Sequence, residues 1–223
     1  MSPLRKRRPD GFTLIEAMIV VAIIGVITSL AGAALVYGMD RARLKNALFE
    51  VSAVATAAQI RSSSSGVPNY MVFYESGSDF GVLIIQKDDP EPIVSEWEAL
   101  DVDALPAGWR QVDRLVLSQS ERLVFAALSD FTVATVKPPF PTPSLTATGA
   151  SGLRSACNFC VAAPGGALGA LRFSSDGTMR PSPANAALTS ALVGLRVSGD
   201  STTPNSKLFA FAIPAGLVRI FDK

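Results

Sequence analysis

The feature that most constrains this 223-residue chain is an apolar run of 24 positions, from Leu14 to Tyr37. Only Glu16, Thr28 and Ser29 interrupt it, and four consecutive basic residues, 5–8, come shortly before it. About 20 apolar residues in a helix cross the hydrocarbon core of a bilayer. We therefore predict a membrane-spanning helix. The basic residues place its N-terminus in the cytoplasm and the rest of the chain across the membrane.

One carboxylate, Glu16, lies near the start of this run, where a charge at the bilayer centre costs at least ~2.5 kcal/mol. Residues 11–16, Gly-Phe-Thr-Leu-Ile-Glu, resemble the type IV prepilin signature. The resemblance implies that a prepilin peptidase cuts between Gly11 and Phe12, that the new Phe12 amine is methylated, and that Glu16 sets register during filament assembly. The alternative is a plain signal anchor in which the glutamate is accidental.

The chemistry of the cut gives Glu16 a role of its own. Cleavage creates an amine on Phe12 within a turn of the Glu16 carboxylate. In a staggered bundle of such helices, the amine of one subunit meets the carboxylate of its neighbour, and a low dielectric strongly favours this pair over two unpaired charges.

Beyond Met39 the pattern becomes amphipathic. Five apolar residues recur at spacings of four, three, four and three, which is one face of a helix: Leu44, Leu48, Val51, Ala55 and Ala58. We predict one helix from about Phe12 to Ser62. The chain then divides into a leader (1–11), a transmembrane half-helix (12–38), an amphipathic half-helix (39–62) and an extracytoplasmic head (63–223).

Pilins that form the main shaft of a filament usually carry a proline where this chain has Ala33. Its absence leaves open whether the helix unwinds there. Gly32 weakens a helix by about 1 kcal/mol relative to alanine. A row of small residues, Gly25, Ser29 and Ala33, is either a close-contact face for another helix or a matter of composition.

The remainder of the chain predicts an antiparallel β head, so that the fold class is α+β. Short β-branched and aromatic runs alternate with turn residues, at 70–74, 81–85, 114–117, 123–126, 131–136, 171–173, 192–197, 209–213 and 217–221. The last two runs flank Pro214-Ala215-Gly216, which indicates a C-terminal hairpin.

Three head segments resemble the GspH/FimT (FimU-like) group of minor pilins and minor pseudopilins. They are the helix end 57–61, the Phe-x-x-Asp-Gly turn at 173–177 and the terminal hairpin at 213–220. The resemblance implies a structural subunit at or near the tip of a type IV pilus or type II secretion pseudopilus. Its partners would be other minor pilins, the major pilin and the inner-membrane assembly platform. Its head would lie in the periplasm before incorporation into the filament.

Charge argues against a nucleic-acid surface. The formal charge is +1, and the leader contributes four cations and one anion, which leaves the mature chain near −2. Residues 75–103 hold nine carboxylates and one cation, Lys87. Oxygen clusters of this kind bind calcium in some related pseudopilins, but the spacing lacks the EF-hand pattern. A solvated acidic face is the preferred interpretation, and we expect no metal or cofactor.

The two cysteines, Cys157 and Cys160, are separated by two residues. We expect a disulfide in an exported head, with a redox motif as the alternative. The chain has no histidine, which excludes serine triads and cysteine–histidine nucleophiles. Two rival functions remain: a DNA-uptake pilin, for which Arg219 and Lys223 are the nearest basic candidates, and a membrane-tethered enzyme.

The segment 137–148 is rich in proline, serine and threonine and predicts an extended, exposed loop. It is either a partner-binding arm or a tolerated surface insertion.

Overall fold

The computed structural model describes residues 13–77, 79–87, 90–117, 123–137, 140, 143–183, 188–198 and 206–222. The leader and Phe12 lie outside the described residues. The chain divides into two compact units, residues 1–39 and 40–223, and each is described by itself. One helix, α1 (Leu14–Ser65), contributes to both.

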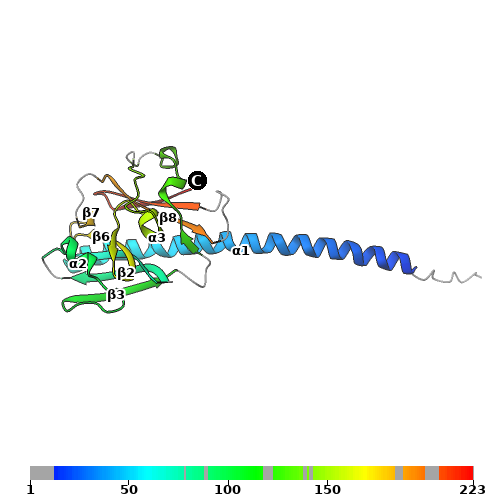
Figure 1. Ribbon diagram of the computed structural model, residues 1–223, viewed down its shortest axis with the longest axis horizontal. Helices are drawn as coiled ribbons and strands as arrows, with labels where there is room; N and C mark the ends of the chain where they lie inside the picture. Colours follow the sequence, from blue (N-terminus) through cyan, green and yellow to red (C-terminus); the bar gives the residue numbers. More distant parts are fainter. Residues whose placement is uncertain are drawn as a thin grey trace, which may run out of the picture. The chain divides into compact units, whose positions relative to one another are not determined.

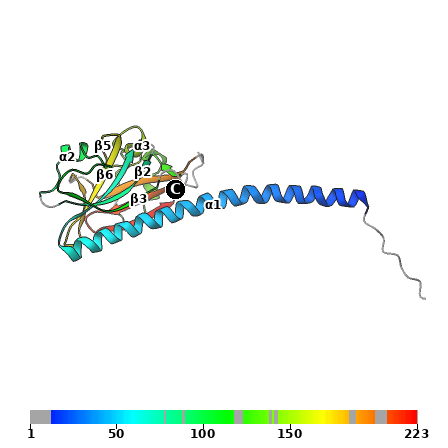
Figure 2. The same cartoon turned by 90° about the horizontal axis from the view of Figure 1, so that it is seen from below.

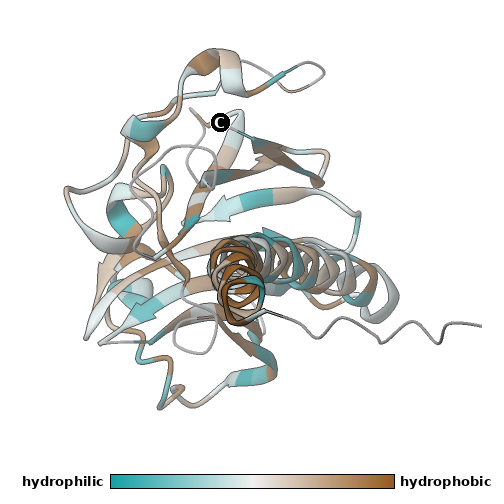
Figure 3. Ribbon diagram, turned by 90° about the vertical axis from the view of Figure 1, so that its right-hand side faces the viewer, coloured by the Kyte–Doolittle hydropathy of each residue, from teal (hydrophilic) through white to brown (hydrophobic). Residues whose placement is uncertain are grey.

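In the first unit, α1 begins after Thr13, whose carbonyl and hydroxyl oxygens accept the Glu16 N–H at 3.1 and 3.3 Å. Its span Leu14–Gly32 is long and apolar enough to cross a membrane, and none of its residues is buried against the described part of the chain. Figure 3 looks down the axis of this part of α1, which is largely in the brown of hydrophobic residues. The helix is unbroken at Gly32, so the structure has no unwinding at that position.

In the second unit, α1 buries the predicted stripe. Leu44, Leu48, Val51, Ala55 and Ala58 are each at most 3% exposed. The helix ends at Ser65 rather than Ser62, because the Ser64 and Ser65 hydroxyls donate to the Arg61 carbonyl and extend the last turn. Gly66 then leaves the helix at φ +71°.

Two antiparallel sheets form the head, so the predicted α+β class is confirmed (Figures 1 and 2). The six-stranded sheet has the order β3-β2-β1-β6-β5, with β7 also paired to β6. Its strands are β1 (Asn69–Ser76), β2 (Asp79–Lys87), β3 (Trp109–Val116), β5 (Val161–Ala163), β6 (Gly166–Phe173) and β7 (Met179–Ser182). The second sheet has the order β10-β9-β8-β4. Its strands are β4 (Leu123–Phe125), β8 (Ser190–Val197), β9 (Ser206–Ala212) and β10 (Leu217–Asp222).

Alternation along the strands divides the buried side chains into three cores. The largest joins the α1 stripe to the inner faces of both sheets, through Phe73, Phe173 and Phe211 among others. A second core covers the outer face of the six-stranded sheet with the short helix α2 (Val94–Glu98), whose Trp97 is fully buried. A third core covers the outer face of the four-stranded sheet.

The predicted strand at 131–136 is wrong. Two 3₁₀ turns, η1 (Leu128–Asp130) and η2 (Val133–Thr135), occupy this region. The Thr132 N–H donates to the Thr135 hydroxyl at 3.3 Å, so a side chain takes the place of a strand partner. Phe131 and Val136 are nevertheless buried, which explains the apolar pattern.

The predicted C-terminal hairpin is confirmed. β9 and β10 pair antiparallel, with Phe211 opposite Val218 and Phe209 opposite Ile220. Gly216 takes φ +68° in the connecting turn, as the predicted turn requires.

Candidate functional site

Among the residues that the structure describes, the candidate assembly site begins with the first turn of α1. Glu16 lies there, exposed, and the apolar side chains around it are also exposed, with Leu14 at 80% and Ile15 at 67%. Among the residues that the structure describes, none forms an ion pair with Glu16. Gly11 and Phe12, the predicted cleavage and methylation positions, lie outside the described residues.

The small-residue row is open where it is described. A Cβ on Gly25 would meet nothing within 4 Å, and the Ser29 hydroxyl donates to the Val26 carbonyl of its own helix at 2.8 Å. The side chain of Ala33 lies outside the described set. Gly25 and Ser29 therefore present a shallow, apolar surface, because the one polar group is satisfied within the helix.

The three head segments that resemble the GspH/FimT group meet at the end of α1. Gln59 donates to the Gly177 carbonyl at 3.2 Å, and the buried Ser62 donates to the Ser174 carbonyl at 3.2 Å. A Cβ on Gly216, in the terminal hairpin, would lie 3.0 Å from the Gln59 amide nitrogen. Turn, hairpin and helix end thus fix one another.

Within that turn, Asp176 holds the backbone. Its carboxylate accepts the Thr178 hydroxyl at 2.6 Å and the Thr178 N–H at 2.9 Å. These two hydrogen bonds, the hydroxyl first, lower the pKa of Asp176 because they favour its charged form. Gly177 follows at φ +81°, a conformation that glycine adopts without strain.

The outer face of the second half of α1 carries a groove of about 480 Å³. Phe49 and Ile60 are 80% and 64% exposed, and Ile220 of β10 completes the groove across Ala53 and Ala57. The groove is mainly apolar. Phe49, Ala53 and Ile60 recur at helical spacing opposite the buried stripe, so the groove leaves a signal in the sequence.

Cys157 and Cys160 form a disulfide, as predicted, and both are buried between the sheets. Cys157 bridges to Val193 of β8, and the side chain of Asn158 accepts the Leu192 N–H at 2.8 Å and donates to the Ser190 carbonyl at 3.0 Å. The cysteine loop therefore completes the edge of β8 beyond the short strand β4.

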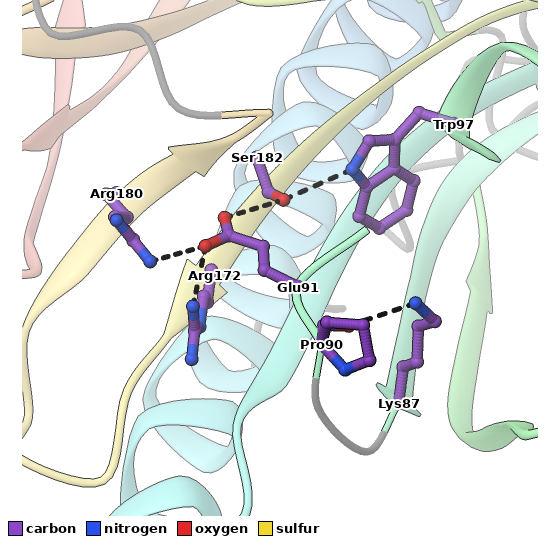
Figure 4. A network of polar contacts seen from close by, with 7 residues as sticks. All are labelled: Lys87, Pro90, Glu91, Trp97, Arg172, Arg180 and Ser182. Atoms are coloured by element: carbon purple, nitrogen blue, oxygen red, sulfur yellow. Dashed lines mark hydrogen bonds and ion pairs between the residues drawn. The ribbon is translucent and has the colours of Figure 1, made fainter. Parts of the chain in front are cut away.

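Residues 90–103 of the acidic segment cover the outer face of the six-stranded sheet. The prediction of a solvated acidic face is therefore incomplete, because part of the segment is packed and ion-paired. Glu91 accepts from Arg172 at 2.7 Å and contacts Arg180, and the Ser182 hydroxyl donates to it at 3.2 Å (Figure 4). Trp97 donates its indole N–H to that Ser182 hydroxyl at 3.1 Å. Glu91 thus fastens the segment to β6 and β7.

Other carboxylates of the segment have separate partners. Glu96 pairs with Lys87 at 3.1 Å and accepts the Ile93 N–H at 2.9 Å; this backbone bond first, and then Lys87, lower its pKa. Asp103 pairs with Arg114 at 2.7 Å. Within the described ranges, no three acidic or cysteine side chains gather as a metal site; Asp88 and Asp89 fall outside those ranges.

The described part of the proline-rich segment is extended but is not an exposed arm. Phe140 is 6% exposed and packs edge-to-face on Phe221 of β10, with ring centroids 5.5 Å apart. Pro143 is buried as well. The sequence prediction of exposure is wrong at these two residues, and Phe140 belongs to the third core. Residues 138, 139, 141 and 142 lie outside the described set.

Comparison with known proteins bears on the N-terminus alone. No curated protein and no solved structure matches the chain. Residues 6–32 match a family model described as the prokaryotic N-terminal methylation motif. This range includes three of the four basic residues, the predicted cleavage position, Glu16 and the apolar span of α1. The chain therefore carries the N-terminus of a type IV pilin-like protein.

Proposed function

We propose that this protein is a minor pilin or minor pseudopilin of the GspH/FimT group. It is a structural subunit, not an enzyme, and acts at or near the tip of a type IV pilus or type II secretion pseudopilus. Prepilin peptidase cuts it between Gly11 and Phe12, and Phe12 is then methylated. Its head faces the periplasm, and its partners are other minor pilins, the major pilin and the assembly platform.

The observation that carries this proposal is the methylation motif over residues 6–32 on a helix whose apolar span is unburied within the chain. Such a span needs lipid before assembly and neighbouring helices afterwards. The contact between the helix end and the turn supports the GspH/FimT assignment, because Gln59 and Gly177 both lie in segments that resemble that group.

Ion pairing of four head cations supports assembly over DNA uptake, and Lys223, one of the two basic candidates for DNA binding, lies outside the described residues. Arg172 and Arg180 pair with Glu91, Lys87 pairs with Glu96, and Lys207 pairs with Asp222. Affinity for a phosphate backbone requires clustered cations that are available to phosphate. A cation that is paired with a carboxylate is less available to bind phosphate.

The experiment that tests the proposal replaces Glu16. Pairing with the Phe12 amine of a neighbour would be lost in Glu16→Leu, so the variant should insert and be cleaved but enter filaments about tenfold less or worse. Glu16→Asp, which keeps the charge with a shorter reach, should be intermediate. The measurement is the amount of this protein in sheared filaments relative to membranes.

Two controls accompany it. Thr28→Val removes a hydroxyl that donates to the Ile24 carbonyl of its own helix at 2.8 Å, so assembly should persist. Gly11→Val should retain the leader, which intact mass reports. If Glu16→Leu enters filaments as well as the wild type does, charge pairing does not set register in this subunit.

A further inference from the structure

A second cavity lies in the head, and all of its lining residues belong to the second unit. It has a volume of about 590 Å³, within the range of roughly 300–1,000 Å³ typical of ligand sites. It lies between β4 of one sheet and the ends of β1 and β2 of the other. Its lining includes Glu75, Phe80, Asp130 and Arg196, together with all three residues of β4.

The first relevant property of this cavity is a strand edge. β4 is the last strand of its sheet and pairs with β8 through Leu123–Phe125 opposite residues 195–197. Its other edge faces away from β8. A strand edge that lines a cavity suits an extended peptide, because main-chain hydrogen bonds supply affinity and neighbouring pockets supply specificity.

The second property is a cation of the lining, Arg196, with an unsatisfied hydrogen-bond donor. Arg196 lies opposite Val124 in the β4–β8 register. Its Nε atom is buried and has no hydrogen-bond partner within the part of the chain that the structure describes. Guanidinium N–H groups bind carboxylates in short, charge-assisted hydrogen bonds. An acidic side chain is therefore the group that best satisfies this wall of the cavity.

The two acids of the lining limit which peptides fit. Glu75 is held against the start of α3 (Gly152–Ser155), where it accepts the Leu153 N–H at 2.7 Å. Asp130 adds a second negative charge. A strongly acidic peptide would be repelled, whereas one acidic residue among apolar ones matches both Arg196 and the apolar wall. That wall includes Phe80 and Phe125, whose ring centroids are 4.6 Å apart.

We propose that this cavity binds an extended peptide segment of a partner subunit, which pairs with the free edge of β4 and places a single acidic side chain against Arg196. The inference rests on the proposed function only for the identity of the partner as another subunit, since peptide binding depends on neither leader cleavage nor Glu16. Peptide binding is measured on unassembled protein, so its failure and the failure of the assembly mechanism are distinguishable.

The test uses the full chain in detergent micelles and a phage-displayed library of random twelve-residue peptides, with empty micelles as counter-selection. Selected peptides should share one acidic residue flanked by apolar or β-branched residues. The synthesised consensus peptide is then titrated by fluorescence anisotropy. Arg196→Gln should raise its Kd at least about tenfold. Arg61→Gln, an exposed position on α1, is the matched control and should stay within twofold.

Two further measurements make the test specific. Changing the acidic residue of the peptide to its amide should weaken binding to the wild type but not to Arg196→Gln, since the same pair is already lost. N-methylation of the central peptide bonds should also weaken binding, because it removes strand hydrogen bonds. If Arg196→Gln does not fold, Arg196→Lys, which keeps the charge without the guanidinium fork, should show an intermediate Kd.

Several results would overturn the proposal. They are a selection that enriches no peptide, a consensus without an acidic residue, equal binding by Arg196→Gln and wild type, or N-methylated peptides that bind undiminished.

Discussion

At the scale of single residues, the head depends on glycines that admit a close neighbour. Gly169 of β6 lies beneath the disulfide loop, where a Cβ would be 2.3 Å from the Cys160 sulfur and 2.9 Å from the Phe159 ring. Both neighbours are buried and held by the cysteine loop, so neither can withdraw cheaply. The sequence offered no sign of this contact, because it depends on the loop packing over β6.

We therefore expect Gly169→Ala to destabilise the head by about 1–3 kcal/mol, the usual cost of overpacking a tight core. Urea unfolding of the full chain in detergent, followed by tryptophan fluorescence, measures it. Gly38→Ala is the matched control, because a Cβ there meets nothing within 4 Å. Equal stability of Gly169→Ala and the wild type would show that the loop shifts freely.

At the scale of elements, residues 90–105 act as a cover for the outer face of the six-stranded sheet. Trp97 packs edge-to-face with Tyr70 and Trp109, with ring centroids 5.5 and 5.1 Å apart. Glu91 and Glu96 fasten the polar side of this cover. What the sequence presents as an acidic run is thus a set of separate ion pairs around a buried tryptophan.

The cover should loosen in acid through Glu96. Its folded-state pKa lies below the ordinary 4.5, because the Ile93 N–H and Lys87 favour the carboxylate. The resulting stability is present above about pH 4.5 and is lost as the pH falls through the lowered pKa. Limited proteolysis of the segment between pH 7 and pH 3 should accelerate at the acid end. An acid-stable protease such as pepsin suits the lower part of this range.

Glu96→Gln should already be cleaved faster at pH 7 and should change less on acidification than the wild type. Glu98→Gln, an exposed position on the same short helix, should follow the wild-type profile. Wild-type and Glu96→Gln profiles that are parallel over the whole range would exclude this carboxylate as the acid-sensitive group.

Sequence alone predicted the elements that have a strong local period. The α1 stripe alternates at 3.6 residues, and the strands of the C-terminal hairpin alternate at two around a proline–glycine turn. It failed where burial comes from distant contacts. Phe131 and Phe140 are apolar because they cover β8 to β10, not because their segments are strands. The three-residue strand β5 carries too little pattern to be recognised.

The candidate site divides in the same way. Glu16 was predicted because a lone charge in an apolar run is costly wherever the run ends up. Arg196, Glu75 and Asp130 lie on three separate segments, and only the pairing of β4 with β8 and the position of α3 bring them to one cavity. The spacing of these three residues in the sequence does not predict that they line one cavity.

At the scale of the whole molecule, two apolar surfaces are left uncovered by the residues that the structure describes: the span Leu14–Gly32 and the groove around Phe49. An assembled filament gives each a place to be buried. Leu48 is 3% exposed and its neighbour Phe49 is 80% exposed. Substitutions at these two positions therefore test the stability of the head and the proposed assembly separately.

We expect Phe49→Ala to leave the free energy of unfolding within about 0.5 kcal/mol, as for most surface substitutions. Incorporation into filaments should nevertheless fall severalfold, because the groove loses its largest apolar side chain. Leu48→Ala should lower the free energy of unfolding by about 2–5 kcal/mol, because it opens a cavity in the core. Its amount in filaments should fall only in proportion to its amount in membranes.

The two variants are compared by the ratio of filament to membrane protein, with unfolding measured on the same preparations. A normal ratio for Phe49→Ala would mean that the groove is not a subunit contact, and that the apolar span of α1 with Glu16 suffices for assembly. A reduced filament-to-membrane ratio with normal stability would place a neighbouring subunit on the outer face of α1. The loss would then come from a contact between subunits, because Phe49 is not part of the core of the head.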